Sequence, residues 1–144
     1  MNLETSKKIL RIAGILSIVG AVFMLILSAI GFIGGGSAAS QPGIETNEEL
    51  QKTVAGALVG GILFLFIGIA GLAEGIISYL TGKTGKKNLA TAAMVFAVIT
   101  TINLVSNLIK SPGTTSNIVN SLISIALNLL SLYAAYVVRK AAEA

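Results

Sequence analysis

The chain contains no cysteine, no histidine and no tryptophan among its 144 residues. Without cysteine it forms no disulfide and no thiolate metal site, and without histidine it lacks the commonest metal ligand and the usual general base. No cluster of carboxylates replaces them, so we expect no catalytic residue, no metal and no cofactor, and hence a protein that is not an enzyme. The absence of tryptophan leaves the tyrosines to supply any aromatic belt at a membrane surface: Tyr79, Tyr133 and Tyr136.

Charged residues are also scarce. They make up 11% of the chain, against about 25% in soluble domains, while 54% of the residues are hydrophobic and the mean hydropathy is +0.88. Such a chain has too little polar surface to face water, so lipid must cover it. Its net charge of +4 does not indicate a nucleic-acid partner, because the basic residues lie at the ends of apolar runs, where membrane topology requires them. We therefore expect membrane lipid as a partner, and no nucleic acid.

Four apolar stretches, separated by three polar breaks, fill most of the sequence. Each reaches the roughly 20 mainly apolar residues that a spanning helix needs. We predict an all-α integral membrane protein with a single transmembrane domain over residues 1–144. The predicted helices cover about residues 9–36, 47–81, 88–110 and 117–140.

The polar breaks carry residues typical of helix ends. Thr46 and Glu49 have the spacing of a capping box, which predicts that the second helix begins near Asn47. Glycine and proline clusters predict where helices stop, because glycine favours the turn after a helix and proline cannot continue one. These clusters are Gly34-Gly35-Gly36, Pro42-Gly43, Gly82-Lys83-Thr84-Gly85 and Ser111-Pro112-Gly113.

The distribution of lysine and arginine predicts the orientation. With four spans, eight basic residues fall on one side of the membrane, and only Lys52 and Lys110 fall on the other. Because positive charge stays on the cytoplasmic side, both termini are predicted to be cytoplasmic. The eight residues are Lys7, Lys8, Arg11, Lys83, Lys86, Lys87, Arg139 and Lys140.

Small residues recur at alternating spacings of three and four along the first, second and fourth apolar runs. Helices in lipid associate through close backbone contact, so small residues should mark the interior. In the second helix the expected packing positions include Gly61, Gly68, Gly71 and Gly75. A spacing of three and four is a heptad, which predicts a left-handed up-down four-helix bundle with crossing angles near about +20°.

The second helix also carries Gly56-x-x-x-Gly60 and Gly71-x-x-x-Gly75. Either pair could form a second contact face, within the bundle or against another subunit. The choice between a monomer and a homo-oligomer stays open.

Glu74 is the one ionisable residue well inside an apolar run. A charged carboxylate at that depth is costly, so it should face the interior, pair with a cation or stay protonated. Arg11 is the first candidate for that cation because it starts the first helix on the same side of the membrane, and Arg139 is the second candidate. Glu74 is thus either a proton- or cation-coupling site of a carrier, or a structural charge that extends to the membrane surface or pairs with Arg11.

Polar residues also follow the third and fourth helices in the half far from the basic side. We expect them to form a network between these two helices, which are joined by a short loop. The network is either interhelical hydrogen bonding or the polar lining of a path for a small solute or ion. Its expected members are Thr100, Asn103, Asn107, Asn120, Ser124 and Asn128.

Three segments resemble a diffuse group of small four-span integral membrane proteins of Gram-positive bacteria. These are the basic start from Lys7 to Gly14, the glycine-spaced run from Gly68 to Lys83, and the end of the fourth helix from Leu132 to Lys140. The resemblance implies a bacterial cytoplasmic membrane and no assigned activity. Small multidrug-resistance exporters also have four spans and one intramembrane glutamate, but theirs is in the first helix.

Two functions follow from these observations. The first is a non-enzymatic membrane protein that acts through contacts with lipid, with a second copy or with another membrane protein, as an accessory, assembly or immunity-type factor. The alternative is a small proton- or cation-coupled carrier or channel that uses Glu74.

Overall fold

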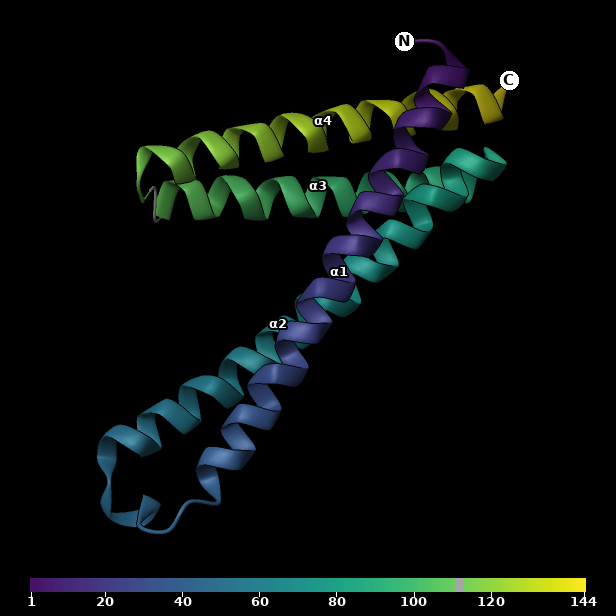
Figure 1. Cartoon of the computed structure of the whole chain (residues 1–144). Coiled ribbons are helices and arrows are strands. Elements are labelled where there is room, and N and C mark those ends of the chain that lie inside the picture. The colour runs from purple at the N-terminus through teal and green to yellow at the C-terminus, as the bar shows by residue number, and fades with distance from the viewer. Residues whose placement is uncertain (111–112) are drawn as a thin grey trace. The chain divides into compact units, whose positions relative to one another are not determined.

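The computed structural model describes residues 1–110 and 113–144, which form four α-helices and one short 3-10 helix. All four α-helices are long and apolar enough to cross a membrane, which confirms an all-helical, multi-pass membrane protein (Figure 1). The predicted helix stop at Ser111-Pro112-Gly113 lies partly outside the described residues. The elements are α1 (Leu3–Ala39), η1 (Ile44–Thr46), α2 (Glu48–Thr84), α3 (Lys87–Lys110) and α4 (Thr115–Glu143).

The helices α1, α2 and α4 begin earlier than their apolar runs because polar side chains cap them in front of the membrane. The carboxamide oxygen of Asn2 accepts a hydrogen bond from the Thr5 amide at 2.8 Å, inside the first turn of α1. Thr114 caps α4 in the same way, because its hydroxyl oxygen accepts from the Asn117 amide at 3.4 Å.

The predicted capping box of α2 is wrong by one residue. Asn47 is the cap, and its carboxamide oxygen accepts from the Leu50 amide at 3.0 Å. The hydroxyl of Thr46 donates to the Gly43 carbonyl oxygen at 3.0 Å instead. That bond holds the turn before the helix, where Gly43 has a φ of 84°. Threonine is therefore part of the loop, and asparagine does the capping.

Helix α1 continues through the glycine triplet and ends at Ala39. Gly35 is buried, and a Cβ at that position would lie 2.9 Å from Cδ2 of Leu58 on α2. This glycine therefore serves close packing between helices rather than termination.

The chain folds into two compact units, residues Ser17–Ala73 and residues Met1–Leu16 with Glu74–Ala144. In the unit Ser17–Ala73, α1 and α2 run antiparallel in backbone contact (Figure 1). The Ser28 hydroxyl donates to the Gly61 carbonyl oxygen at 2.7 Å, and a Cβ on Gly31 would lie 3.0 Å from the Ala57 carbonyl oxygen.

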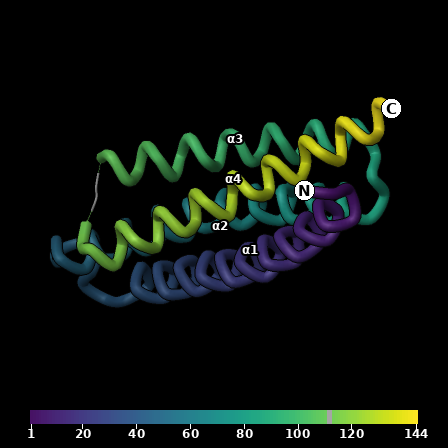
Figure 2. Tube along the Cα trace, turned by 90° about the horizontal axis from the view of Figure 1, so that it is seen from above, coloured from purple at the N-terminus to yellow at the C-terminus, as the bar shows by residue number. Residues whose placement is uncertain are grey.

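The other unit contains the apolar core, where the start of α1, the end of α2, the start of α3 and the end of α4 meet. Helices α3 and α4 lie side by side within it (Figure 2). The start of α3 is tied to the end of α4 by an ion pair between Lys87 and Glu143 at 3.0 Å. Short side chains allow the helices to approach closely. The core consists of Leu10, Ala90, Ala93, Ala134, Ala135 and Val138, with Ile9, Ile77 and Met94 packed against it.

Candidate functional site

The intramembrane carboxylate of Glu74 lies on α2, close to α3 in space. Its Oε2 accepts a hydrogen bond from the Thr100 hydroxyl at 3.4 Å, and both residues are half-buried. The next residue along α2, Gly75, is buried against α1, so Glu74 flanks this helix contact and reaches toward α3 instead. The structure thus brings together two of the residues that the sequence singled out.

Arg11 is not the partner of Glu74. It is exposed on α1, and its Cγ lies 2.9 Å from the position of a Cβ on Gly82. Gly82 is eight residues beyond Glu74 on α2, which corresponds to about 12 Å along the helix axis. Within residues 1–110 and 113–144, the ion pairs join Glu143 to Lys87 and to Arg139.

The expected polar residues of α3 beyond Thr100, Asn103 and Asn107, bond to each other rather than to α4. Asn103 and Asn107 are exposed, and the Asn107 amide donates to the Asn103 carboxamide oxygen at 3.5 Å on the same helix. The half-buried positions in this part of α3 are instead Leu104, Ser106 and Leu108. The two asparagines therefore lie beside the contact face rather than on it.

The polar residues of α4 show the same offset. Asn120 and Ser124 are exposed, and the Ser124 hydroxyl donates to the Asn120 carbonyl oxygen at 2.9 Å, again within one helix. Asn128 is half-buried, together with Ile125 one turn earlier. In the described part of the chain, the hydrogen bonds of these residues form no network between α3 and α4, and Thr100 alone of the expected set bonds to another helix.

The glycines expected to pack between helices are buried or half-buried. A Cβ on Gly68 would lie 3.2 Å from the Ala21 carbonyl oxygen, and one on Gly71 would lie 3.1 Å from the Ala21 Cβ. Gly61 accepts the Ser28 hydrogen bond described above. Gly75 lies in the other unit, where its carbonyl oxygen is 2.6 Å from the position of a Cβ on Gly14.

The other glycine pair of α2 has a different environment. A Cβ on Gly56 or on Gly60 would meet no atom within 4 Å. Within the unit Ser17–Ala73 this face of α2 is therefore uncovered, whereas the face that carries Gly71 is occupied by α1.

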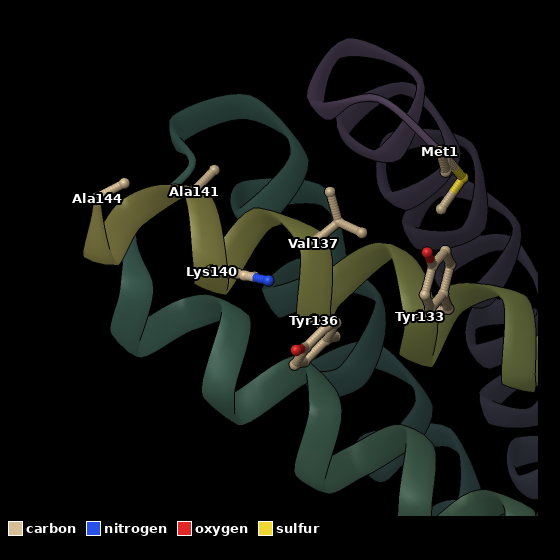
Figure 3. A pocket seen from close by; sticks show the side chains of 7 residues that line it. All are labelled: Met1, Tyr133, Tyr136, Val137, Lys140, Ala141 and Ala144. Carbon is tan, nitrogen blue, oxygen red and sulfur yellow. The ribbon is translucent and has the colours of Figure 1, made fainter.

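One further feature was missed by the sequence reasoning, an open groove of about 400 Å³ along the end of α4 (Figure 3). The rings of Tyr133 and Tyr136 stack with centroids 6.5 Å apart, and Lys140 follows one turn later on the same face. The spacing of three and four from Tyr133 to Lys140 was the available signal. We call this feature the tyrosine groove; it is lined by Met1, Tyr133, Tyr136, Val137, Lys140, Ala141 and Ala144.

Comparison with protein families, with curated proteins and with solved structures finds no match for this chain. Among the described residues, no three metal-ligating side chains gather at one place. The structure offers a carboxylate that can exchange a proton, a set of close helix contacts and a groove that joins aromatic rings to an ammonium group.

Proposed function

We propose that this chain is a non-enzymatic membrane protein that acts through contacts with lipid, with a second copy or with another membrane protein, as an accessory, assembly or immunity-type factor. The observation that carries the proposal is the close backbone approach of α1 and α2. Ser28 and Gly61 share a buried hydrogen bond of 2.7 Å, and Gly14 leaves no room for a side chain against Gly75. Contacts of this kind build helix assemblies in lipid.

The proposed architecture is a left-handed up-down bundle in the cytoplasmic membrane with both termini inside. It is supported by the basic residues at the start of α1, the end of α2, the start of α3 and the end of α4. Because the chain has no cysteine, single cysteines report the side directly. In right-side-out vesicles a membrane-impermeant maleimide should label Ser116→Cys and spare Asn88→Cys; the reverse result contradicts the orientation.

The function is tested by ion flux in proteoliposomes. A protein that acts through contacts should pass no more protons or monovalent cations than empty liposomes, under either direction of the pH gradient. Replacing Glu74 by glutamine should also leave the measured ion flux unchanged. Flux that requires Glu74 would contradict the proposal.

Self-association decides whether a second copy is one of the contacts. Copies labelled at Ser116→Cys with a donor or an acceptor dye should show energy transfer in liposomes that falls with dilution in lipid. Gly60→Leu should reduce the transfer if the open glycine face of α2 is the interface. Gly20→Leu is the matched control, because Gly20 likewise has no atom within 4 Å of an added Cβ. Transfer that is unaffected by Gly60→Leu excludes this face.

A second candidate function is a proton- or cation-coupled carrier. It is favoured by the hydrogen bond from Thr100 to Glu74, which joins an ionisable group to α3 at a half-buried position. The carrier predicts flux that is lost in Glu74→Gln and weakened in Thr100→Val. Glu49→Gln is the control, since Glu49 is an exposed carboxylate in the first turn of the same helix.

A further inference from the structure

The tyrosine groove lies at the level where a spanning helix passes from acyl chains to headgroups. The apolar run of α4 covers residues 118–138, so Tyr133 lies inside it and Lys140 lies just beyond it. Lys140 is seven positions beyond Tyr133, which corresponds to about 10 Å along the axis. Tyrosine is enriched at this depth because its ring is apolar and its hydroxyl is polar.

The exposure of the two rings shows that the groove opens outward. Tyr133 and Tyr136 are 51% and 46% exposed, although both belong to a helix whose opposite face is buried in the core at Ala134, Ala135 and Val138. Figure 3 shows the rings beside one another, with Val137 between the turns that carry Tyr133 and Lys140. The groove therefore combines apolar walls toward the membrane centre with polar hydroxyls and a cation toward the water.

One cationic side chain, that of Lys140, lines the groove, and no acidic side chain lines it. Arg139 and Lys87 already pair with Glu143, whereas Lys140 makes no ion pair among the described residues. Glu4, in the first turn of α1, is the acidic residue nearest to Met1 in the sequence, and it does not line the groove. A second copy of the chain would bring the same excess of positive charge to this end, which opposes pairing through this face.

We propose that the tyrosine groove binds an anionic glycerophospholipid, with the phosphate on Lys140 and an acyl chain along Val137 and Tyr133. The proposal rests on the proposed function and names the lipid class for its lipid contact. An ammonium group near an anionic headgroup favours its binding about fivefold over a zwitterionic lipid. Tyr136 also lines the groove, and its hydroxyl can donate to the phosphate or to the ester oxygens.

The absence of tryptophan makes a local reporter possible. Leu130 is 44% exposed and lies one turn before Tyr133, so Leu130→Trp places a single fluorophore below the groove and leaves every lining residue intact. Phe66→Trp is the reference, because Phe66 is 68% exposed on α2, far along the chain from the groove. Each variant is reconstituted in phosphatidylcholine with increasing amounts of acyl-brominated phosphatidylglycerol or acyl-brominated phosphatidylcholine, and quenching is measured.

Quenching of the Leu130→Trp reporter is expected to show an apparent affinity for the phosphatidylglycerol about five times that for the phosphatidylcholine. The Phe66→Trp reporter is expected to show a ratio close to one. Adding Lys140→Gln should abolish the preference of the Leu130→Trp reporter for phosphatidylglycerol. Adding Lys110→Gln should leave that preference unchanged, because Lys110 is an exposed lysine at the C-terminal end of α3. Far-ultraviolet circular dichroism checks that each variant keeps its helices.

Three results would overturn the proposal. The first is equal quenching by the two lipids at position 130, and the second is a preference that persists in Lys140→Gln. The third is recovery of fluorescence by inorganic phosphate at an ionic strength matched with sodium chloride, which would assign the groove to a free anion. None of these results alters the ion-flux test, so the lipid site can fail while the proposed function stands.

Discussion

Replacing Gly14 by alanine tests whether α1 and α2 are held together by backbone contact. The added Cβ would lie 2.6 Å from the Gly75 carbonyl oxygen and 2.6 Å from the Tyr79 amide nitrogen. A carbon–oxygen contact of this type normally needs about 3.3 Å, so the helices must separate by about 0.7 Å. Both obstructing atoms belong to the backbone, so no side-chain rotation can relieve the overlap.

The expected cost follows from comparison with Gly20→Ala on the same helix. A Cβ on Gly20 meets no atom within 4 Å, so this variant gains only the helix preference of alanine, roughly 0.5–1 kcal/mol. Gly14→Ala has the same gain but also overpacks the contact, at a cost of about 1–3 kcal/mol. The free energies of unfolding of the two variants should therefore differ by about 1–3 kcal/mol, with Gly14→Ala the less stable.

The assay is equilibrium unfolding by dodecyl sulfate in mixed micelles. Near-ultraviolet circular dichroism of the tyrosines follows it, since Tyr79 adjoins the altered contact. Far-ultraviolet circular dichroism controls for the loss of α1 itself. If Gly14→Ala unfolds at the same dodecyl sulfate fraction as Gly20→Ala, or later, the contact between α1 and α2 at this position does not exist.

Three further predictions concern hydrogen bonds and charge. Ser28→Ala removes the bond to the Gly61 carbonyl oxygen and should lower the free energy of unfolding by about 0.6 kcal/mol in the same assay. Asn47→Ala removes the cap of α2 and should cost about 1 kcal/mol, seen as faster amide exchange in the first turn. The hydrogen bond and charge of Lys87 lower the pKa of Glu143 below its ordinary value of 4.5. The ion pair with Lys87 therefore stabilises the fold above pH 4.5, and this stabilisation is lost as the pH falls through the lowered pKa of Glu143. Unfolding midpoints measured over a series of pH values will show the loss.

Each of these predictions has a control. Ser124→Ala should be nearly neutral, because the Ser124 hydroxyl bonds within its own helix at an exposed position. Asn120→Ala should leave amide exchange at the start of α2 unchanged. Lys87→Gln should remove most of the acid-dependent loss of stability, and an unchanged pH profile in that variant would mean that another group is responsible.

Much of the contact face of α1 was predictable from small residues at alternating spacings of three and four, although Gly20, Gly34 and Gly36 lie outside it, where a Cβ would meet no atom within 4 Å. Ser17, Ala21, Ser28, Gly31 and Gly35 are buried or half-buried in the structure. In lipid, apolar side chains lose nothing by facing outward, so the pattern of small residues carries the packing information. Glycine also allows backbone contact that no other residue permits.

The polar residues of α3 and α4 were harder to place because one position changes the face. Thr100 reaches Glu74, but Asn103 and Asn107 turn away from the half-buried Leu104. Asparagine can satisfy part of its hydrogen-bonding capacity along its own helix, so its presence alone does not identify an interhelical contact. The spacing of these residues therefore indicated that they share one face of a helix. Which neighbouring helix that face contacts depends on how each helix is rotated about its axis.

The pair of Glu74 with Arg11 failed to form for a different reason. Both residues belong to the same end of the molecule, but charge patterning gives only the side of the membrane and not the register between helices. In the structure the register is set by backbone contacts, which place Arg11 beside Gly82. A long arginine side chain can then extend to water instead of reaching along the helix.

The unequal lengths of the helices have a consequence for the choice of bilayer. Helices α1 and α2 each have 37 residues, or about 55 Å, whereas α3 has 24 residues, or about 36 Å. The hydrocarbon layer is about 30 Å thick, so α3 has only a few ångströms in excess and the longer pair has many. When the bilayer is thickened by longer acyl chains, the hydrocarbon layer should therefore exceed the length of α3 before it exceeds that of α1 or α2. Helix α3 carries Thr100, so membrane thickness becomes a means of straining its bond to Glu74 without altering a single residue.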